Sequence, residues 1–325
     1  MLPCFYVIIN RIRFLVKDVM EKKIYMNPKK VLLLMNSHAG LGAAGAKLFD
    51  IVRYLTVDGC EVTVYPLLKN GAMSSEEILR TRGSYFDVIA CYGGDGTLNR
   101  TISGMLNAGL TKPLGFFPGG STNDFAKSIG LGSDLSIQCA AVSGTNAFAH
   151  DIGVFNDKYF NYVAAFGAFT QVSYQTNQSV KNALGYWAYV LETIHSLPES
   201  VSSRCHMRIE HDGQVEEGYY LYGAISNSRS VGGLSTTLMK DAVLDDGLFE
   251  VMLVSAPDNI MEVGELLSTF SSGNIDNQHV KLFTASKLHI ESKDQVPWTL
   301  DGDFGGAPAV VEFSVLPKAV QILVP

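Results

Sequence analysis

Two glycine-rich loops carry the residues with the most specific chemistry. The first, Gly93-Gly94-Asp95-Gly96-Thr97, follows the apolar run Val88–Tyr92 and precedes a segment of helical character that begins at Leu98. Glycines remove the Cβ atoms that would keep an anion away from backbone N–H groups, so such a loop at a helix start favours phosphate. A carboxylate beside a phosphate is repulsive unless a metal ion or a transferable proton lies between them. Asp95 therefore predicts Mg-nucleotide chemistry, and a tight turn with a capping aspartate is the structural alternative.

The second loop, Pro118-Gly119-Gly120-Ser121-Thr122-Asn123-Asp124, follows the apolar run 114–117. Ser121 and Thr122 offer hydroxyl donors, and the last two residues place a polar pair at the start of a helix. Taken alone, Asp124 suits a helix cap as well as a functional carboxylate. Two such loops after neighbouring strands favour one shared binding site.

The elements that must position these loops alternate in type. Apolar runs at 31–35, 61–65, 86–91 and 114–117 are separated by stretches of helical character. This pattern predicts a doubly wound α/β domain with a mostly parallel sheet, whose ligands bind at the carboxyl ends of the strands. Both loops stand at such ends.

After about residue 147 the pattern changes to short alternating runs, which predict an antiparallel β-sandwich. The expected strands are 151–155, 203–210, 218–226, 248–254, 281–290, 297–301 and 309–315, and the expected helices are 180–197 and 258–271. We therefore expect an N-terminal extension at 1–26, an α/β domain at 27–147 and a sandwich domain at 148–325, and we allow the last segment to return to the first domain.

Composition narrows the function further. The formal net charge of −7 argues against a nucleic-acid binder, which needs clustered Lys and Arg. The five cysteines form no CxxC pair, so neither a disulfide framework nor a zinc site is expected and a reducing cytoplasm is the natural compartment. The apolar run Phe5–Ile9 is too short to span a membrane. Residues 1–26 are either an amphipathic surface anchor or a misassigned start, with Met26 as the true one.

Two later motifs complete a resemblance. Leu244-Asp245-Asp246-Gly247-Leu248 and Leu300-Asp301-Gly302-Asp303 follow the two glycine loops, and this order resembles the bacterial diacylglycerol kinase and sphingosine kinase-like lipid kinases. The resemblance implies a nucleotide-binding domain like that of phosphofructokinases and NAD kinases, followed by a β-sandwich that carries the lipid site. It also implies Mg²⁺-dependent transfer of the γ-phosphate of ATP to a lipid hydroxyl, with diacylglycerol as the expected acceptor.

The resemblance also assigns roles to individual residues. The expected base is Asp303, and Asp124 matches a cleft carboxylate. The residues expected at the nucleotide are Asn36, Gly93, Gly94, Asp95, Gly96, Thr97, Leu98, Asn99 and Ser121. Mg²⁺ is expected at Asp95 through water, and a structural Mg²⁺ at Asp246 with the carbonyls of Val243 and Leu248. From the residues alone, Asp245-Asp246-Gly247 is a hairpin turn.

The chain departs from the family pattern at several positions. Asp303 stands where the family has Glu, which shortens the arm by one carbon, about 1.5 Å. The segment Asn36-Ser37-His38-Ala39-Gly40 replaces the usual Asn-Pro-x-Ser-Gly, and Arg100 stands where an acidic residue is common. The shortened side chain of Asp303 keeps open a nucleotide- or lipid-binding protein that has lost catalysis. An NAD kinase-like enzyme is the other alternative, because NAD kinases share the glycine-aspartate motif and the two-domain plan.

An NAD-dependent oxidoreductase fits less well. Gly40-Leu41-Gly42-Ala43-Ala44-Gly45 reads as a dinucleotide pattern, but the second strand ends in Val64-Tyr65-Pro66, without the acidic residue that binds the ribose. The partners we expect are ATP, a lipid substrate and a membrane surface contacted peripherally, without nucleic acid. We allow for a homodimer.

Overall fold

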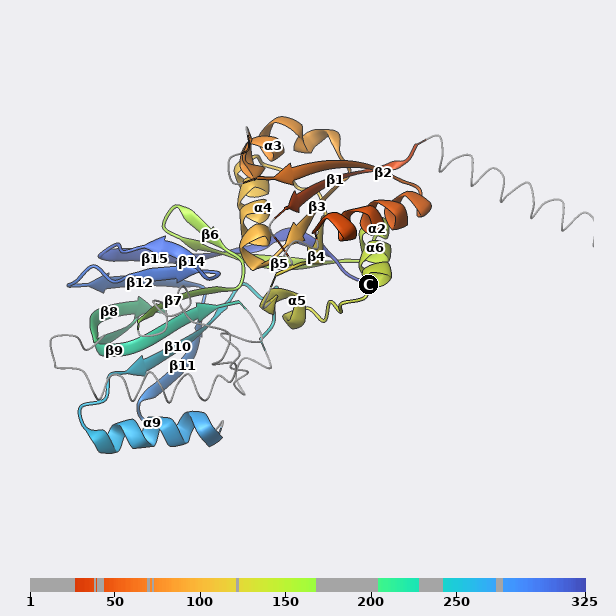
Figure 1. The fold of residues 1–325 in the computed structure, drawn as a ribbon. Coiled ribbons are helices and arrows are strands. Elements are labelled where there is room, and N and C mark those ends of the chain that lie inside the picture. Colours follow the sequence, from red (N-terminus) through yellow and green to blue (C-terminus); the bar gives the residue numbers. More distant parts are fainter. Residues whose placement is uncertain are drawn as a thin grey trace, which may run out of the picture.

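We analysed a computed structural model of the chain (Figure 1). The structure describes residues 27–37, 39, 44–68, 71, 73–120, 123–167, 204–227, 242–272 and 277–325. The segment 1–26, the helix expected at 180–197 and the nucleotide-binding candidate Ser121 lie outside these residues.

The first half is a parallel sheet with helices on both faces. Its strands are β1 (Lys29–Asn36), β2 (Cys60–Leu67), β3 (Val88–Gly93) and β4 (Leu114–Pro118), and they lie in the order β2, β1, β3, β4. Its helices are α2 (Ala44–Val57), α3 (Ser75–Arg82), the 3-10 turn η2 (Gly83–Tyr85), α4 (Asp95–Asn107), α5 (Asp124–Ser128) and α6 (Leu135–Ser143). Strands β1 and β3 are buried almost throughout, as central parallel strands covered on both faces must be.

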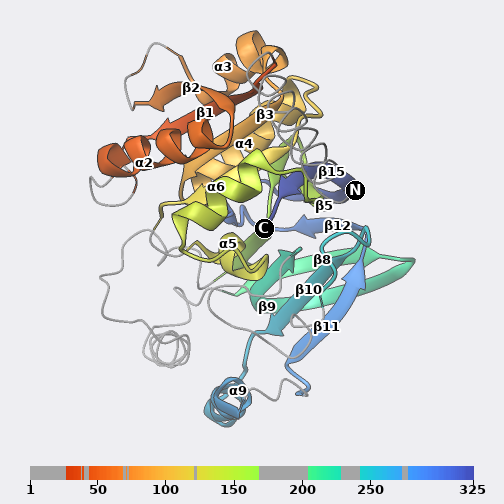
Figure 2. The same cartoon turned by 90° about the vertical axis from the view of Figure 1, so that its right-hand side faces the viewer.

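The second half is built mainly from antiparallel strands. They are β5 (Ala147–Phe155), β6 (Lys158–Phe160), β7 (Val163–Gly167), β8 (Cys205–His211), β9 (Gln214–Ser226), β10 (Phe249–Ser255), β11 (Val280–Ala285), β12 (Lys287–Ser292), β13 (Trp298–Leu300), β14 (Asp303–Gly306) and β15 (Val310–Leu323), with helix α9 (Ile260–Ser272). The strands curve around one another below the α/β half, and α9 lies at the far end (Figures 1 and 2). The expected fold class, an α/β domain followed by a β-sandwich, is confirmed.

The long strand β15 joins the two halves. It pairs antiparallel with β5 and β12, and near its end Ile322 pairs parallel with Leu114 of β4. The described strands therefore form one continuous sheet, in the order β14-β13-β7-β9-β8-β12-β15-β4-β3-β1-β2 with side branches. A register shift lies between Leu316 and Val320, where Lys318 has a φ of 53°.

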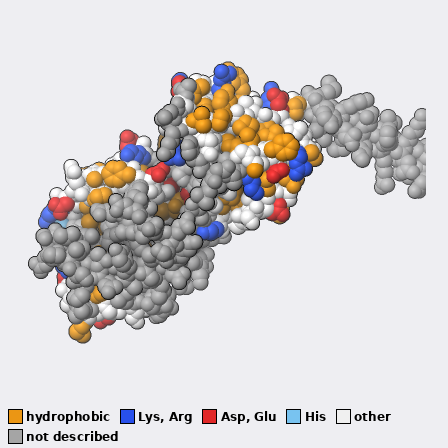
Figure 3. Space-filling view, in the orientation of Figure 1, with side chains coloured by type: hydrophobic (Ala, Val, Ile, Leu, Met, Phe, Trp, Pro, Cys, Tyr) orange, Lys and Arg blue, Asp and Glu red, His pale blue; other side chains and the backbone are white. Residues whose placement is uncertain are grey.

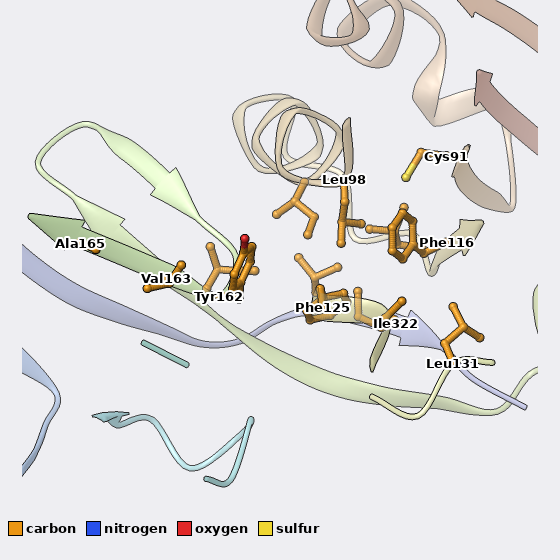
Figure 4. Close-up of a cluster of buried hydrophobic side chains, with 14 of the residues drawn as sticks. Cys91, Leu98, Phe116, Phe125, Leu131, Tyr162, Val163, Ala165 and Ile322 are labelled. Atoms are coloured by element: carbon orange, nitrogen blue, oxygen red, sulfur yellow. The ribbon is translucent and has the colours of Figure 1, made fainter. Parts of the chain in front are cut away.

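The hydrophobic core crosses the same junction. One cluster of buried side chains runs from α4 and β4 through α5 to β7 and β15, with Leu98, Phe116, Phe125, Val163 and Ile322 among its members (Figure 4). A second cluster, around Trp298 and Phe313, fills the sandwich alone. A third packs α2 and α6 on the other face of the parallel sheet. The first cluster fixes the two halves against each other, so residues of both can meet at one site.

The surface is mixed in character. In Figure 3, hydrophobic side chains gather over the α/β half, and basic and acidic side chains are interspersed among them. On α2, Phe49 and Val57 are largely exposed. None of the helices in the described ranges is long and apolar enough to cross a membrane.

Candidate active site

The two glycine loops touch each other at the carboxyl ends of β3 and β4. The N–H of Gly119 donates to the carbonyl of Gly93 at 2.7 Å. A Cβ atom on Gly120 would lie 2.6 Å from the Cα of Gly94, which is closer than real Cβ contacts come. The side chain of Asn123 braces the second loop, because its Oδ1 accepts the N–H of Gly120 at 2.8 Å and its Nδ2 donates to the carbonyl of Gly120 at 2.9 Å. The loops thus form one backbone surface.

Helix α4 begins at this surface. The N–H groups of Thr97 and Leu98 donate to the carbonyl of Gly94, closing the first turn. The first backbone N–H groups of an α-helix have no acceptor within the helix, and the positive end of the helix dipole lies here. Leu98 turns its side chain into the core. The first turn can therefore bind an anion through backbone N–H groups.

The loop after β1 contributes to the same edge. Asn36 lies at the end of β1, and its Nδ2 donates to the Oγ1 of Thr97 at 3.0 Å. Thr97 also fills the space beside Gly93, where an added Cβ would lie 2.4 Å from Oγ1. Asn99 lies one turn further along α4, and its Oδ1 accepts the hydroxyl of Ser103 at 3.3 Å. The structure therefore brings Asn36 and the residues from Gly93 to Thr97 together.

Asp95 is a buried carboxylate at the centre of this arrangement. It is 7 % exposed, and its Oδ1 accepts the N–H of Phe125 at 3.4 Å. That contact ties the first loop to α5. Asp124 is the first residue of α5 and Asn123 occupies the cap position, without a capping hydrogen bond from its side chain. The side chain of Asp124 lies outside the described atoms.

A hairpin from the second half reaches this site. Strands β13 and β14 are joined by Asp301 and Gly302, whose φ angles are 50° and 87°. This two-residue turn with both φ angles positive is the one that Asp-Gly favours. The buried carboxylate of Asp301 accepts the N–H groups of Asn161, Tyr162 and Val163 at 2.6, 2.9 and 3.0 Å.

Asp301 and Asp95 form a buried acidic pair. Burial raises the pKa of Asp301 to about 7, the amide hydrogen bonds oppose that rise, and the negative charge of Asp95 adds to it. Buried carboxylates whose negative charges act on each other are destabilised unless a proton or a cation lies near them. The donor chemistry at Asp95 therefore fits a divalent cation.

The anchored hairpin places Asp303 over the first turn of α4. An added Cβ on Gly96 would lie 3.2 Å from the Oδ2 of Asp303. The same Oδ2 accepts the Nη1 of Arg100 at 3.2 Å. An acidic side chain from the sandwich half thus lies directly beside the first turn of α4 in the α/β half.

The segment with the second expected metal site lies elsewhere on the second half. The buried carboxylate of Asp151 anchors this segment, because its Oδ2 accepts the N–H of Gly247 at 2.6 Å. Its Oδ1 accepts the N–H of Lys318, in β15, at 2.6 Å. The exposed Asp246 accepts the N–H of Leu248 through Oδ1 at 3.0 Å. The segment is a turn that leads into β10.

Oxygen donors of this turn fit Mg²⁺, which prefers carboxylate and carbonyl ligands. Close by, burial raises the pKa of Glu250 to about 7 and the charge of Asp246 adds to the rise. The Oε2 atom of Glu250 is buried without a hydrogen-bond partner in the structure. No three His, Cys, Asp or Glu side chains gather as a metal cluster within the described ranges, so an ion would also need carbonyl, water or phosphate oxygens.

Sequence reasoning did not find the buried supports of the site. The motifs assign no role to Asp301 or Asp151, and they mark Arg100 only as a departure from the family pattern. The sequence predicts no more than a surface or hydrogen-bonded position for His150, whose Nε2 bonds the side chain and carbonyl of Asn161 at 2.9 and 3.1 Å. The Asp-Gly pair signals a turn, but no local pattern tells that its carboxylate binds amides 138 to 140 residues away.

Comparisons with known proteins identify the family of the chain. Residues 30–155 match the family model described as the diacylglycerol kinase catalytic domain, and residues 163–324 match that of the YegS C-terminal NAD kinase beta sandwich-like domain. The chain is 29 % identical to a diacylglycerol kinase of Staphylococcus carnosus over 91 % of this chain and 95 % of the relative. It is 30 % identical to one of Staphylococcus haemolyticus over 90 % of this chain and 87 % of the relative.

A solved structure shares the fold. A crystal structure of a diacylglycerol kinase from Bacillus anthracis (strain Sterne) aligns with a TM-score of 0.69 at 19 % identity, covering 91 % of this chain and 97 % of that one. The two-part fold predicted from the sequence is the fold of this neighbour, and the sequence relatives confirm the predicted resemblance. The chain belongs to the diacylglycerol kinase family and is a lipid kinase.

Proposed function

We propose that the protein transfers the γ-phosphate of ATP to the hydroxyl of diacylglycerol, giving phosphatidic acid, in a Mg²⁺-dependent reaction. One observation carries the proposal: Asp303, from the sandwich half, lies beside Gly96 in the first turn of α4. A carboxylate that accepts a proton and a backbone that binds phosphate are thereby held within reach of one substrate pair.

The nucleotide site we propose is the joined surface of the two glycine loops. The amides of Gly94, Asp95 and Gly96 would bind the phosphates, with Asn36 holding Thr97 in place beside them. Thr97, Leu98 and Asn99 would act mainly by forming the first turn of α4, and Ser121 would add a hydroxyl. The close approach of Gly94 and Gly120 supports this proposal, because it leaves the backbone itself as the lining.

The proposed Mg²⁺ sites use different residues. Asp95 would hold the catalytic ion through water, supported by its burial beside Asp301. Bound there, Mg²⁺ would neutralise charge on the phosphate oxygens. Asp246, with the carbonyls of Val243 and Leu248, would hold a structural ion, and Asp124 would add a carboxylate to the cleft.

In the proposed reaction the lipid oxygen attacks the γ-phosphorus while its proton passes to the carboxylate of Asp303. The bond between the γ-phosphorus and the bridging oxygen breaks, and ADP leaves with the electron pair. Positioning and electrostatics supply most of the acceleration in phosphoryl transfer, and a base contributes a factor of about 10²–10⁴. Loss of Asp95 should therefore cost at least as much activity as loss of Asp303.

We also propose that the enzyme works from the cytoplasm on a membrane surface. Diacylglycerol lies in a bilayer, so the site has to approach one. Phe304, next to Asp303, is 65 % exposed and offers an apolar side chain where an acyl chain would arrive. The described cysteines are free, as suits a reducing compartment.

The test is transfer of ³²P from γ-labelled Mg-ATP to diacylglycerol, a sphingoid base and NAD⁺, with wild type, Asp95→Ala and Asp303→Ala. Asp258→Ala is the matched control, because Asp258 also pairs with an arginine at 3.1 Å but lies in the sandwich half, away from Asp95 and Gly96. We expect labelled phosphatidic acid from wild type and control, and almost none from the other two. Label on NAD⁺ alone, or on no acceptor, would overturn the proposal.

A further inference from the structure

Arg100 and Asp303 meet although they stand 203 residues apart in the sequence. Arg100 comes from the second turn of α4, and Asp303 begins β14. Their contact depends on the hairpin that Asp301 anchors to the amides after β6. The ion pair is therefore a product of the assembled site.

Both side chains lie over the same glycine. A Cβ atom added to Gly96 would be 3.2 Å from the Oδ2 of Asp303 and 3.8 Å from both terminal nitrogens of Arg100. Gly96 also lies in the first turn of α4, whose backbone N–H groups belong to the proposed phosphate site. The guanidinium and the carboxylate thus share the space directly beside the proposed transfer site.

The ion pair with Arg100 engages only one of the two carboxylate oxygens of Asp303. The Nη1 of Arg100 bonds Oδ2 at 3.2 Å, so Oδ1 remains to accept the proton of a substrate hydroxyl. The side chain of Asp303 is 61 % exposed and that of Arg100 57 % exposed. Exposed ion pairs contribute little to folding, but an exposed aspartate without a partner samples several rotamers.

We propose that Arg100 is a positioning residue, which holds the short arm of Asp303 in the orientation needed for proton acceptance. This inference rests on the proposed kinase function and assigns Arg100 a role through Asp303. The competing role is a direct one, in which Arg100 leaves Asp303 and binds the phosphates of ATP. The two roles make different kinetic predictions.

The experiment measures kcat and the KM for ATP in wild type, Arg100→Ala, Arg100→Lys, Asp303→Asn and the double variant Arg100→Ala/Asp303→Asn. We expect Arg100→Ala to lower kcat about tenfold while the KM for ATP stays within about twofold, because ground-state binding of ATP is not involved. Arg100→Lys should recover most of kcat. Adding Arg100→Ala to Asp303→Asn should cause no further loss, because Arg100 then has no carboxylate to position.

The control is Arg204→Ala, which breaks the ion pair with Asp258 in the sandwich half and should leave both constants unchanged. Thermal unfolding of every variant checks that it is folded. Radiolabelled ATP keeps the slow Asp303→Asn background measurable, since loss of a base costs a factor of about 10²–10⁴.

Four results would overturn the inference. Wild-type kinetics in Arg100→Ala would show that the pair has no role, while the kinase function stands. An equal loss in the Asp303→Asn background, or a raised KM for ATP at unchanged kcat, would identify a phosphate ligand. Absence of transfer by the wild type on every acceptor would remove the proposed function itself, and the wild type alone reveals that outcome.

Discussion

Gly120 has no room for any side chain. An added Cβ would lie 2.6 Å from the Cα of Gly94 and 2.8 Å from the Oδ1 of Asn123. The first of these atoms is backbone and cannot rotate away. We expect Gly120→Ala to weaken ATP binding at least about tenfold, measured by titration calorimetry, because the two loops must separate. Gly132→Ala is the control, since nothing lies within 4 Å of its added Cβ; equal ATP affinity in both variants would contradict a shared phosphate surface.

The short side chain of Asp303 fits the space between Arg100 and Gly96. Its Oδ2 contacts Arg100 and lies against the Gly96 position, so one more carbon would push the carboxylate past both. We expect Asp303→Glu to lower kcat by about three- to tenfold, despite restoring the family's residue, because a base must lie within hydrogen-bond reach in one orientation. Steady-state phosphorylation of diacylglycerol measures this. A rate above wild type would show that the shorter arm limits the enzyme.

His150 makes stability depend on pH. It is fully buried between Phe125 and Phe148, with ring centroids 5.0 and 5.9 Å away. Burial lowers its pKa, and the hydrogen bonds that its ring makes to Asn161 oppose that shift. The histidine of the unfolded chain binds a proton near pH 6.5, whereas the buried histidine of the folded chain stays neutral there. The free energy of unfolding therefore falls as pH drops through that value. We expect His150→Gln to show a smaller loss of Tm between about pH 7.5 and about pH 5.5 than wild type. An identical loss in both proteins would contradict this.

At the scale of elements, the hairpin β13–β14 depends on one anchor. Replacing Asp301 by Ala removes the acceptor of three buried N–H groups. We expect Asp301→Ala to lower the free energy of unfolding by about 3 kcal/mol, because buried donors left without acceptors are costly. Urea unfolding measures this, with Asp294→Ala, on the exposed segment before β13, as control. A change in the free energy of unfolding below about 1 kcal/mol would mean that the hairpin is stable without the hydrogen bonds to Asp301.

The strands of the first half could be predicted because their signal is local. Runs such as 31–35 and 114–117 are apolar throughout, and β1 and β4 cover them. In the second half, the strand boundaries differ from the predicted ones because pairing with partner strands sets them. The run 281–290 divides at Ser286 into β11 and β12, and β15 continues from the expected end at 315 to Leu323 through a shift around Lys318. The alternation of apolar and polar side chains along a strand does not indicate which strand it pairs with, so it cannot predict where the strand ends.

The site divides in the same way. The glycine loops and Asp303 could be identified because motif order marks them. The supports could not, since the contacts of Asp301 with Asn161 and of Arg100 with Asp303 join residues 140 and 203 positions apart. Their geometry exists only after the hairpin has packed against the amides between β6 and β7.

For the whole molecule, one core couples the two halves. Because buried side chains from α4 to β15 belong to the same cluster, we expect a single unfolding transition, with far-ultraviolet circular dichroism and tryptophan fluorescence changing together. Trp298 reports on the sandwich, while circular dichroism reports on both halves. Two separated transitions would show that the halves are stable independently.

Ile322 tests the same coupling at its narrowest point. It is fully buried, and it pairs with Leu114 where β15 meets β4. We expect Ile322→Ala to cost about 2–5 kcal/mol and to broaden the transition, because the cavity opens where the halves join. Calorimetry measures both effects. Val310→Ala, at the exposed start of β15, is the control and should change little.

Strand β15 also sets an order for biosynthesis. A ribosome releases the parallel strands β1 to β4 early, yet β4, paired on one side with β3, gains its second neighbour only when residues near Ile322 have emerged. Until then the nascent α/β half has an open sheet edge and an uncovered apolar face, which are the features that chaperones bind. Translation pausing or truncation late in the message would therefore be as damaging to this kinase as a lesion in its glycine loops.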